Sequence, residues 1–493
     1  MTTRHERIID SRREKLERLR AAGINPYPVS FHRTHTAEQA IALLKQKESG
    51  ATVDEEVTVA GRLTARRLMG KGAFLDLRDG SGKIQLFFHS INEYQAKNLE
   101  LFSDLDIGDF LGVRGKVMRT RSGEPTVRVE DFTLLSKSLQ PLPEKWHGLS
   151  DTEIRYRQRY LDLIANSETR ELFLVRSKAI TAIRSFLDQR GFIEVETPVL
   201  QAEAGGALAK PFVTHHNALD QDFYLRIALE LHLKRLLVGG FDKVYEIGRV
   251  FRNEGISTRH NPEYTLMECY EAYADYHDIM KLVEEMVSAT AQQVLGTTEV
   301  KYGDHTVNLK PPWPRLGLRE AVEKYSGIDF VKYNRADALR AKMQELNIEF
   351  DPGKNWAKLV DELLTTFVEP NLVQPTFLVD YPVSMSPLAK TKEGESRVVE
   401  RFEAFIGCIE VANAFTELND PDEQRKRFEE QMKERQTGDD EVWAVDEDFL
   451  LALEHGMPPT GGLGVGIDRL VMLLTNQQSI REVILFPHAR EKG

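Results

Sequence analysis

Short stretches of alternating apolar and polar residues dominate the chain between residues 57 and 135. Five of them lie at residues 57–63, 73–79, 83–89, 110–117 and 125–135, separated by glycine-containing turns such as DGSGK. Alternation with a period of two predicts strands with one buried and one exposed face. Five short strands in about 80 residues predict a small Greek-key barrel. Ahead of them, residues 4–22 read as a charged helix that ends at Gly23.

Barrels of this kind, the OB type, commonly present aromatic and polar side chains to single-stranded nucleic acid. Phe74, Arg78 and Gln85 are the candidates on the predicted strands. The alternative is structural, because a barrel interior also needs aromatic side chains. The pattern alone leaves both interpretations open.

A connector at residues 136–170 leads into a region where helical and strand patterns mix. Residues 176–190 carry apolar positions at helical spacing, and residues 192–196 read as a strand that Pro198 ends. Residues 244–273 have the pattern strand, loop, strand. These patterns predict a larger α+β domain that runs to the C-terminus.

The second strand of residues 244–273 has an unusual face. Alternation places Tyr264, Leu266, Glu268 and Tyr270 on one side. A carboxylate and two tyrosines suit a pocket floor that stacks on a flat ring at one end and binds a cation at the other. Arg252, at the end of the first strand, suits a phosphate or a carboxylate, because its planar guanidinium can bind two oxygens at once.

Residues 402–420 form a second candidate segment. Alternation puts Asn413, Phe415 and Glu417 on one face, whereas Glu410 joins them only if the strand bulges or bends. The alternative is a half-buried strand with its polar residues facing water, and this segment alone favours that alternative.

Residues 461–470, GGLGVGIDRL, form a third candidate segment. They read as a glycine-rich turn whose glycines permit close approach of the backbone, and Arg469 falls near a predicted helix start. The segment is not a P-loop, since no GxxxxGK[ST] sequence occurs in the chain.

Composition narrows the class of protein. The 493 residues contain no apolar run of the roughly 18 residues that a membrane span needs. The charged N-terminus lacks the apolar stretch of a secretory signal, and two isolated cysteines make a disulfide framework improbable. We therefore expect a cytoplasmic protein. A net charge of −12 argues against nucleic-acid binding over the whole surface, but it does not exclude a local basic face.

The order and the amino-acid sequences of these segments resemble those of the class II aminoacyl-tRNA synthetases. RSFLDQRGFIEVETPVL, FRNEGISTRHNPEYT and GLGVGIDRL look like the three signature motifs of that class, whereas the HIGH and KMSKS signatures of class I are absent. A barrel joined through RYRQRYLDL marks the lysine, aspartate and asparagine subgroup. Short sequences such as SPLAK and NAFTELND are similar to those found in bacterial-type lysine enzymes.

The resemblance implies a fold and a domain order. We expect an N-terminal helical segment at 1–56, an anticodon-binding OB domain at 57–140, a linker at 141–170 and a catalytic domain at 171–493. The catalytic domain of this class is built on an antiparallel sheet flanked by helices, and the first motif builds a homodimer interface. The implied substrates are L-lysine, ATP and tRNA(Lys), with Mg²⁺ as the metal.

The resemblance also assigns residues, in four sets. The lysine set is Gly206, Glu230, Arg252, Glu268, Tyr270, Asn413, Phe415 and Glu417. The ATP set is Arg252, Glu254, His260, Asn261, Tyr264, Glu403, Glu410 and Arg469. Arg252 and Arg469 would be catalytic, and Glu403 and Glu410 would bind magnesium. Phe74, Arg78 and Gln85 would contact the anticodon.

Four positions depart from the family pattern. Leu229 stands where proline is usual, Tyr264 where phenylalanine is common, and Ala414 where glycine is frequent. None of these changes removes a charge or a ligand. Asp131 aligns roughly where a longer glutamate is usual, which leaves its role open.

Three rival interpretations remain. Glu230 and Glu417 argue against an aspartyl or asparaginyl enzyme, because such enzymes meet their substrates with an arginine near position 417. The shortened relative that modifies elongation factor P lacks an anticodon barrel. A catalytically silent paralogue would have no reason to keep Arg252, Glu254, Glu403, Glu410 and Arg469 together.

Overall fold

The computed structural model describes residues 3–52, 56–70, 72–89, 96–143, 149–203, 205–207, 209–435 and 445–489. The chain divides into two compact units, residues 1–150 and 151–493. Residues 144–148 of the predicted linker lie outside the described residues. In the part of the chain that the structure describes, no helix is both long and apolar enough to span a membrane.

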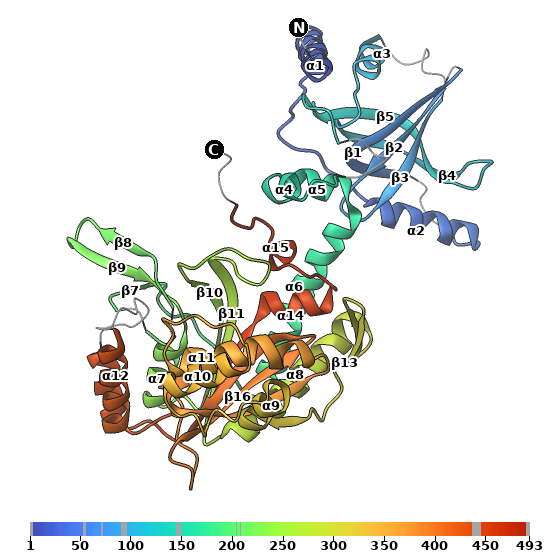
Figure 1. Cartoon of the computed structure of the whole chain (residues 1–493). Helices are drawn as coiled ribbons and strands as arrows, with labels where there is room; N and C mark the ends of the chain where they lie inside the picture. Colours follow the sequence, from blue (N-terminus) through green and yellow to red (C-terminus); the bar gives the residue numbers. More distant parts are fainter. Residues whose placement is uncertain are drawn as a thin grey trace. The chain divides into compact units, whose positions relative to one another are not determined.

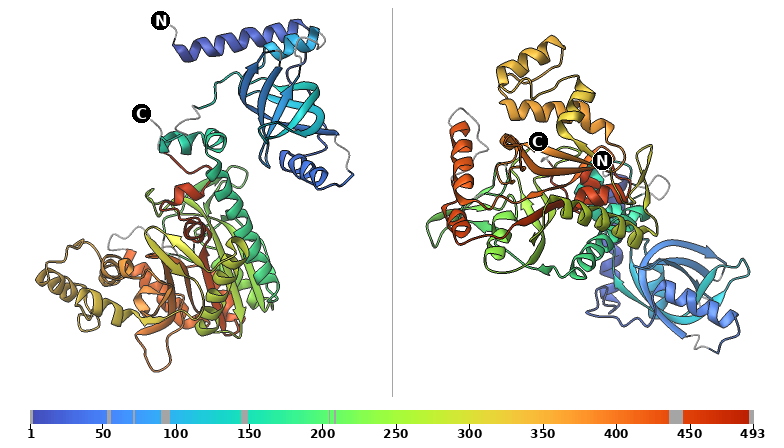
Figure 2. Two further views of the ribbon diagram at one scale, coloured as in Figure 1. Left: turned by 90° about the vertical axis from the view of Figure 1, so that its right-hand side faces the viewer. Right: turned by 90° about the horizontal axis from the view of Figure 1, so that it is seen from below.

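The first unit is a closed five-stranded barrel, as its alternating sequence predicts (Figures 1 and 2). The strand order is β1-β2-β3-β5-β4, and only β3 and β5 pair in parallel. Figures 1 and 2 show α1 and α2 at opposite ends of the barrel. The elements are α1 (Arg4–Ala21), α2 (Ala37–Glu48), β1 (Glu56–Met69), β2 (Gly72–Arg78), β3 (Lys83–Phe88), α3 (Ala96–Ser103), β4 (Phe110–Arg119) and β5 (Pro125–Ser136).

The second unit is built on an eight-stranded sheet of order β14-β15-β16-β17-β18-β11-β10-β6. Its strand pairs are antiparallel except β14–β15 and β10–β6, so the predicted antiparallel sheet has a parallel pair at each edge. The strands are β6 (Ile193–Glu194), β10 (Lys243–Phe251), β11 (Glu263–Ala272), β14 (Arg315–Gly317), β15 (Thr376–Pro382), β16 (Val398–Ile406), β17 (Ile409–Thr416) and β18 (Thr460–Gly466). The α+β prediction is confirmed.

One face of this sheet is covered by α6 (Ser167–Asp188), α8 (Tyr276–Leu295) and α14 (Ile467–Leu474), which form the main apolar core with it. Alternation along β11 sends Met267 and Cys269 into that core. The even-numbered residues of β11, such as Glu268 and Tyr270, therefore face the other side of the sheet, where the pocket lies.

The remaining elements surround the sheet. A separate apolar core joins α9 (Leu318–Ser326), α10 (Ala336–Glu345) and α11 (Trp356–Leu363), which connect β14 to β15. The others are α4 (Thr152–Arg157), α5 (Arg159–Ala165), β7 (Leu200–Gln201), β8 (Val213–His216), β9 (Gln221–Leu225), α7 (Glu230–Val238), β12 (Glu299–Tyr302), β13 (His305–Asn308), α12 (Pro421–Arg435), α13 (Glu447–Glu454) and α15 (Ile480–Val483).

Three local predictions differ from the structure. The helix expected at 176–190 begins earlier, at Ser167, and the strand expected at 192–196 forms only at Ile193–Glu194. The glycine-rich residues 461–466 form strand β18 rather than a turn. Strand pairing on both sides, with β11 and β17, holds this glycine-rich segment extended.

Candidate active site

A pocket of about 480 Å³ opens on the face of the sheet opposite α8 and α14. Its floor is made by β11, β17 and β18, and α7 and the loop after β10 form its walls. Every residue that the sequence assigned to lysine or ATP lines this pocket except Glu403: Gly206, Glu230, Arg252, Glu254, His260, Asn261, Tyr264, Glu268, Tyr270, Glu410, Asn413, Phe415, Glu417 and Arg469.

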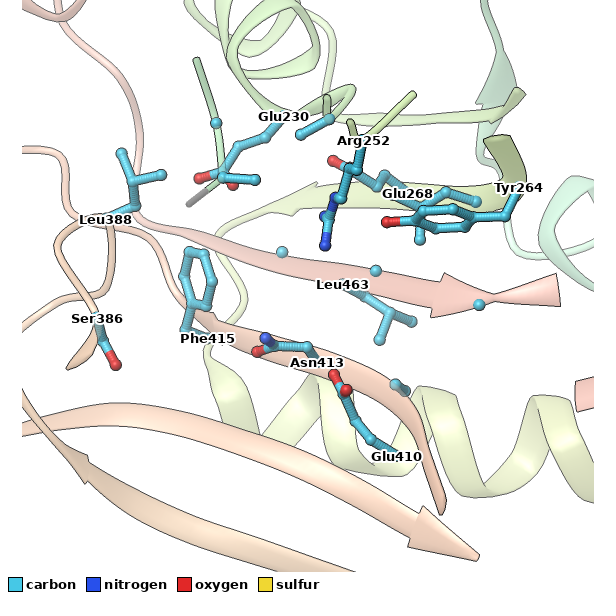
Figure 3. Close-up of a pocket in the computed structure, with 18 of the residues that line it drawn as sticks. Glu230, Arg252, Tyr264, Glu268, Ser386, Leu388, Glu410, Asn413, Phe415 and Leu463 are labelled. Atoms are coloured by element: carbon cyan, nitrogen blue, oxygen red, sulfur yellow. The ribbon is translucent and has the colours of Figure 1, made fainter. Parts of the chain in front are cut away.

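Arg252 occupies the middle of the pocket (Figure 3). Its side chain points inward, between Glu230 on one side and Tyr264 on the other. The backbone N–H of Arg252 donates to the Pro262 carbonyl at 2.8 Å, which closes the loop between β10 and β11. Its Nε donates to the Ile227 carbonyl at 3.3 Å. These bonds leave the end of the guanidinium directed at the cavity.

A bulge in β17 brings Glu410 to the pocket. Ala404 pairs with Ala412 and Phe405 pairs with Glu410, so Val411 has no partner on β16. One extra residue reverses the alternation, and Glu410 then shares a face with Asn413 and Phe415 (Figure 3). The bend on which the sequence interpretation of Glu410 depended is therefore present.

Arg469 lines the pocket beside Glu410. Its Nη1 donates to the carboxylate of Glu410 at 2.8 Å and to the Glu410 carbonyl at 2.9 Å. The neighbouring Asp468 is buried, and it accepts bonds from Arg176 on α6 and from the Thr265 N–H on β11. Asp468 thus anchors the first turn of α14 and places Arg469.

Three buried carboxylates gather at the other end of the pocket: Glu230, Glu268 and Glu417. Glu268 accepts hydrogen bonds from the Tyr270 hydroxyl at 2.8 Å and from the Leu229 N–H at 3.0 Å. Burial, together with the charge of Glu230, raises the pKa of Glu268 to about 7. Burial likewise raises the pKa of Glu417 well above its usual range. Such carboxylates gain from a cationic ligand.

The departure at Leu229 adds a contact to this cluster. A proline at this position would have no N–H and could not donate to Glu268. Gly206, in the left-handed region at φ +87°, lies beside Glu230; a Cβ atom at Gly206 would be 3.4 Å from the Glu230 Cβ. Gly206 and Glu230, which both belong to the predicted lysine set, are therefore neighbours.

Gly462 has a clear structural reason to be glycine. A Cβ atom there would overlap the Glu417 carboxylate and would lie 2.6 Å from the Tyr270 ring. The absence of a side chain on β18 keeps the anionic end of the pocket open.

Glu403 is set back from the pocket wall. Its carboxylate accepts from Tyr381 at 2.8 Å and from Arg401 at 2.6 Å, and Arg401 also donates to Asn413 at 3.2 Å. Burial raises the pKa of Glu403 to about 7, an effect that Arg401 opposes and Glu410 strengthens. The sequence interpretation missed Arg401, although its parity on β16 matches that of Glu403.

The chemistry of Glu403 and Glu410 fits a hard cation. Among the described residues no group of three or more His, Cys, Asp or Glu is placed to bind a metal. Mg²⁺, however, usually binds through one or two carboxylates together with substrate phosphates and waters. Two acidic side chains, one of which is buried beside the charge of the other, suit that mode of binding.

On the barrel, Phe74, Arg78 and Gln85 lie on the outer face of β2 and β3, since alternate residues there are buried. Phe74 stacks on Phe87 with ring centroids 4.8 Å apart at 24°. Gln85 accepts a bond from Thr126 at 3.1 Å. The sequence interpretation missed Phe87, which alternation on β3 would have placed beside Gln85. This face thus presents a stacking surface next to polar groups.

The fold and the pocket define a class of protein. A closed barrel is followed by a mostly antiparallel sheet that carries an arginine-lined pocket, and both units match family models. The chain belongs to the class II tRNA synthetases (D, K and N), whose model matches residues 151–490. Residues 57–135 match the OB-fold nucleic acid binding domain. The protein is therefore an aminoacyl-tRNA synthetase, and the resemblance in the three motifs is confirmed.

Relatives of known name extend over nearly the whole chain. A lysine–tRNA ligase from Dehalococcoides mccartyi is 60% identical over 97% of this chain and 96% of its own length. The enzyme of the same name from Moorella thermoacetica is 56% identical, over 98% and 97%. That from Bacillus cytotoxicus is 52% identical, over 99% of both chains.

Proposed function

We propose that this enzyme is a lysine–tRNA ligase, which activates L-lysine with ATP and transfers it to the 3′-terminal adenosine of tRNA(Lys). The observation that carries the proposal is the division of charge in one pocket. Glu230, Glu268 and Glu417 make one end anionic, whereas Arg252 in the middle and Arg469 towards the other end carry guanidinium groups that suit phosphate. The first end suits the ammonium groups of lysine, and the second suits ATP.

The chemistry needs no protein nucleophile. A carboxylate oxygen of lysine attacks the α-phosphorus of ATP, the bond to the bridging oxygen breaks, and pyrophosphate leaves. A ribose hydroxyl of the terminal adenosine then attacks the activated carbonyl, and AMP leaves. Catalysis therefore rests on positioning and charge stabilisation.

The role that we propose for each residue follows from the position of its side chain in the pocket. Arg252 holds the lysine carboxylate with Asn413 and stabilises the α-phosphate, since its guanidinium reaches the centre. His260 and Arg469 hold the outer phosphates, and Tyr264 stacks on adenine. Asn261 is buried, lines the pocket and, among the described residues, finds no donor for its Oδ1, which suits an amino group of the nucleotide.

Mg²⁺ is part of the proposal, with Glu403 and Glu410 as the residues that would hold it. When bound, the ion neutralises charge on the phosphates. Arg401 keeps Glu403 oriented, and Arg469 does the same for Glu410.

We also propose that the enzyme is a cytoplasmic homodimer. Apolar side chains on β6 to β8 support a dimer, because Ile193, Leu200 and Val213 are each about half exposed or more. A partner of the same sequence would cover them.

The test of the proposed function is ATP–pyrophosphate exchange with lysine, aspartate or asparagine supplied separately. We expect exchange with lysine alone, and its loss when magnesium is omitted. Exchange with aspartate or asparagine would overturn the amino acid assignment. No exchange with any of the three, from folded protein that still binds tRNA, would favour the silent paralogue.

Phe74→Ala should raise the KM for tRNA roughly 10-fold or more, because stacking of a base on an aromatic ring contributes about 1–3 kcal/mol. Lysine-dependent pyrophosphate exchange should not change, since Phe74 belongs to the barrel and the pocket belongs to the other unit. Aminoacylation and exchange would be measured on the same preparation. Tyr27→Ala, an exposed aromatic that bonds to Lys137, is the matched control. Equal loss of both activities would indicate a folding defect instead.

A further inference from the structure

Lys234 is a buried ammonium behind the anionic end of the pocket. It lies one helical turn after Glu230 on α7, and its side chain is 0% exposed. Its Nζ is 2.5 Å from Glu230 Oε1 and also contacts Glu417 Oε2. The rings of Phe415 and Phe449 lie 5.5 and 5.9 Å from it. One cation therefore joins two acidic side chains that come from distant parts of the chain.

Lys234 does not itself line the pocket, whereas both of its partners do. Within the described part of the chain, no group donates a hydrogen bond to Glu417 Oε1, which lies against Gly462. Lys234 thus contacts one oxygen of Glu417 and leaves the other beside Gly462, in the lining of the pocket. A buried acceptor without a donor is costly unless a ligand supplies one.

Burial raises the pKa of both Glu230 and Glu417, and the charge of Lys234 opposes that rise in each. Two carboxylates within reach of one nitrogen would repel each other, and without a cation one of them would take up a proton. Burial alone would lower the pKa of Lys234, but attraction by Glu230 and Glu417 raises it above its ordinary value. The ammonium therefore stays charged.

We propose that Lys234 is a positioning residue that keeps Glu230 and Glu417 ionised together, so that the pocket offers two separate anions to the two ammonium groups of lysine. This inference rests on the proposed function. A merely structural lysine would act only on stability; this one sets the charge state of two binding groups.

The charged and titratable groups around Lys234 come from every neighbouring element. They are Glu230 on α7, Glu268 and Tyr270 on β11, Arg252 after β10, Arg401 on β16, Glu417 after β17, and the Arg235–Asp446 pair at the start of α13. Among them, only Glu230 and Glu417 contact Lys234 directly.

Lys234→Met removes the charge and keeps much of the side-chain volume. We expect the KM for lysine in pyrophosphate exchange to rise about 10- to 100-fold at neutral pH, because a shared proton then replaces one of the two anions. The KM for ATP should change less than about threefold, since the nucleotide side of the pocket keeps its contacts.

The pH profile distinguishes positioning from stability. A carboxyl group with a raised pKa loses its charge as the pH falls, so kcat/KM of Lys234→Met should drop more steeply than that of the wild type between about pH 9 and 6.5. Lys234→Arg, which keeps a cation, should recover most of the activity. Lys243→Met is the matched control: it removes a half-buried lysine that pairs with Glu271 at 2.7 Å outside the pocket.

Each outcome is informative. Wild-type protein without lysine-dependent exchange would overturn the proposed function itself. An active wild type with an unchanged lysine KM and a parallel pH profile in Lys234→Met would overturn the role of Lys234. If the methionine variant does not fold, Lys234→Gln is compared with Lys234→Arg by the same assay. Failure of all three variants to fold, measured by circular dichroism, would make Lys234 a stabilising residue and overturn the inference.

Discussion

Arg252→Ala is expected to abolish lysine-dependent pyrophosphate exchange, with a fall in kcat/KM of about 1000-fold or more. The guanidinium reaches the centre of the pocket, between the anionic cluster and Tyr264, where we propose that the nucleotide binds. In the proposed mechanism it contacts both reactants, so its loss removes orientation of the carboxylate as well as stabilisation of charge on the α-phosphate. The measurement is the initial rate of exchange over a range of lysine concentrations at saturating ATP, which gives kcat/KM for lysine.

The fold should survive this change. Among the described residues, the side chain of Arg252 donates one hydrogen bond, at 3.3 Å to the Ile227 carbonyl. The backbone bond to Pro262 does not depend on the side chain. Arg319→Ala, which removes an arginine paired with Asp329 away from the pocket, is the control and should retain full exchange. Wild-type exchange by a folded Arg252→Ala protein would contradict the assignment.

Much of the pocket could be predicted because successive side chains of a strand point to opposite faces of the sheet. Tyr264, Glu268 and Tyr270 share a face of β11 whatever the rest of the chain does. The same rule left Glu410 in doubt, since one unpaired residue, Val411, changes the face to which Glu410 belongs. Whether a bulge forms depends on pairing with β16, which local sequence does not encode.

Other features required contacts between distant segments. In the sequence, Lys234 looks like an ordinary charged residue on a helix. Its role depends on Glu417, which lies 183 positions further along the chain and which the fold brings into contact with it. The glycines of β18 read as a turn, yet β11 and β17 hold them extended, and Glu417 and Tyr270 fill the space beside Gly462. The N–H of Leu229 gains a role only when β11 places Glu268 opposite it.

Glu417→Gln is expected to lower kcat/KM for lysine about 100-fold, because an amide keeps the shape of the side chain and loses the charge that pairs with an ammonium group. Glu417 is buried, and among the described residues its Oε1 has no hydrogen-bond donor. Water does not screen such a pair well, so the charge carries more weight than it would at the surface.

Norleucine, which has the length of the lysine side chain without the ammonium group, separates charge from shape. Wild-type enzyme should prefer lysine by about 10⁴-fold or more, because a buried group left without its partner is costly. In Glu417→Gln the rate with lysine should fall while the rate with norleucine stays the same or rises. Glu271→Gln changes a carboxylate on β11 that pairs with Lys243 outside the pocket, and it should leave the preference intact. A parallel fall for both amino acids would mean that the variant distorts the pocket, and the carboxylate would then lose its assigned part in selecting lysine.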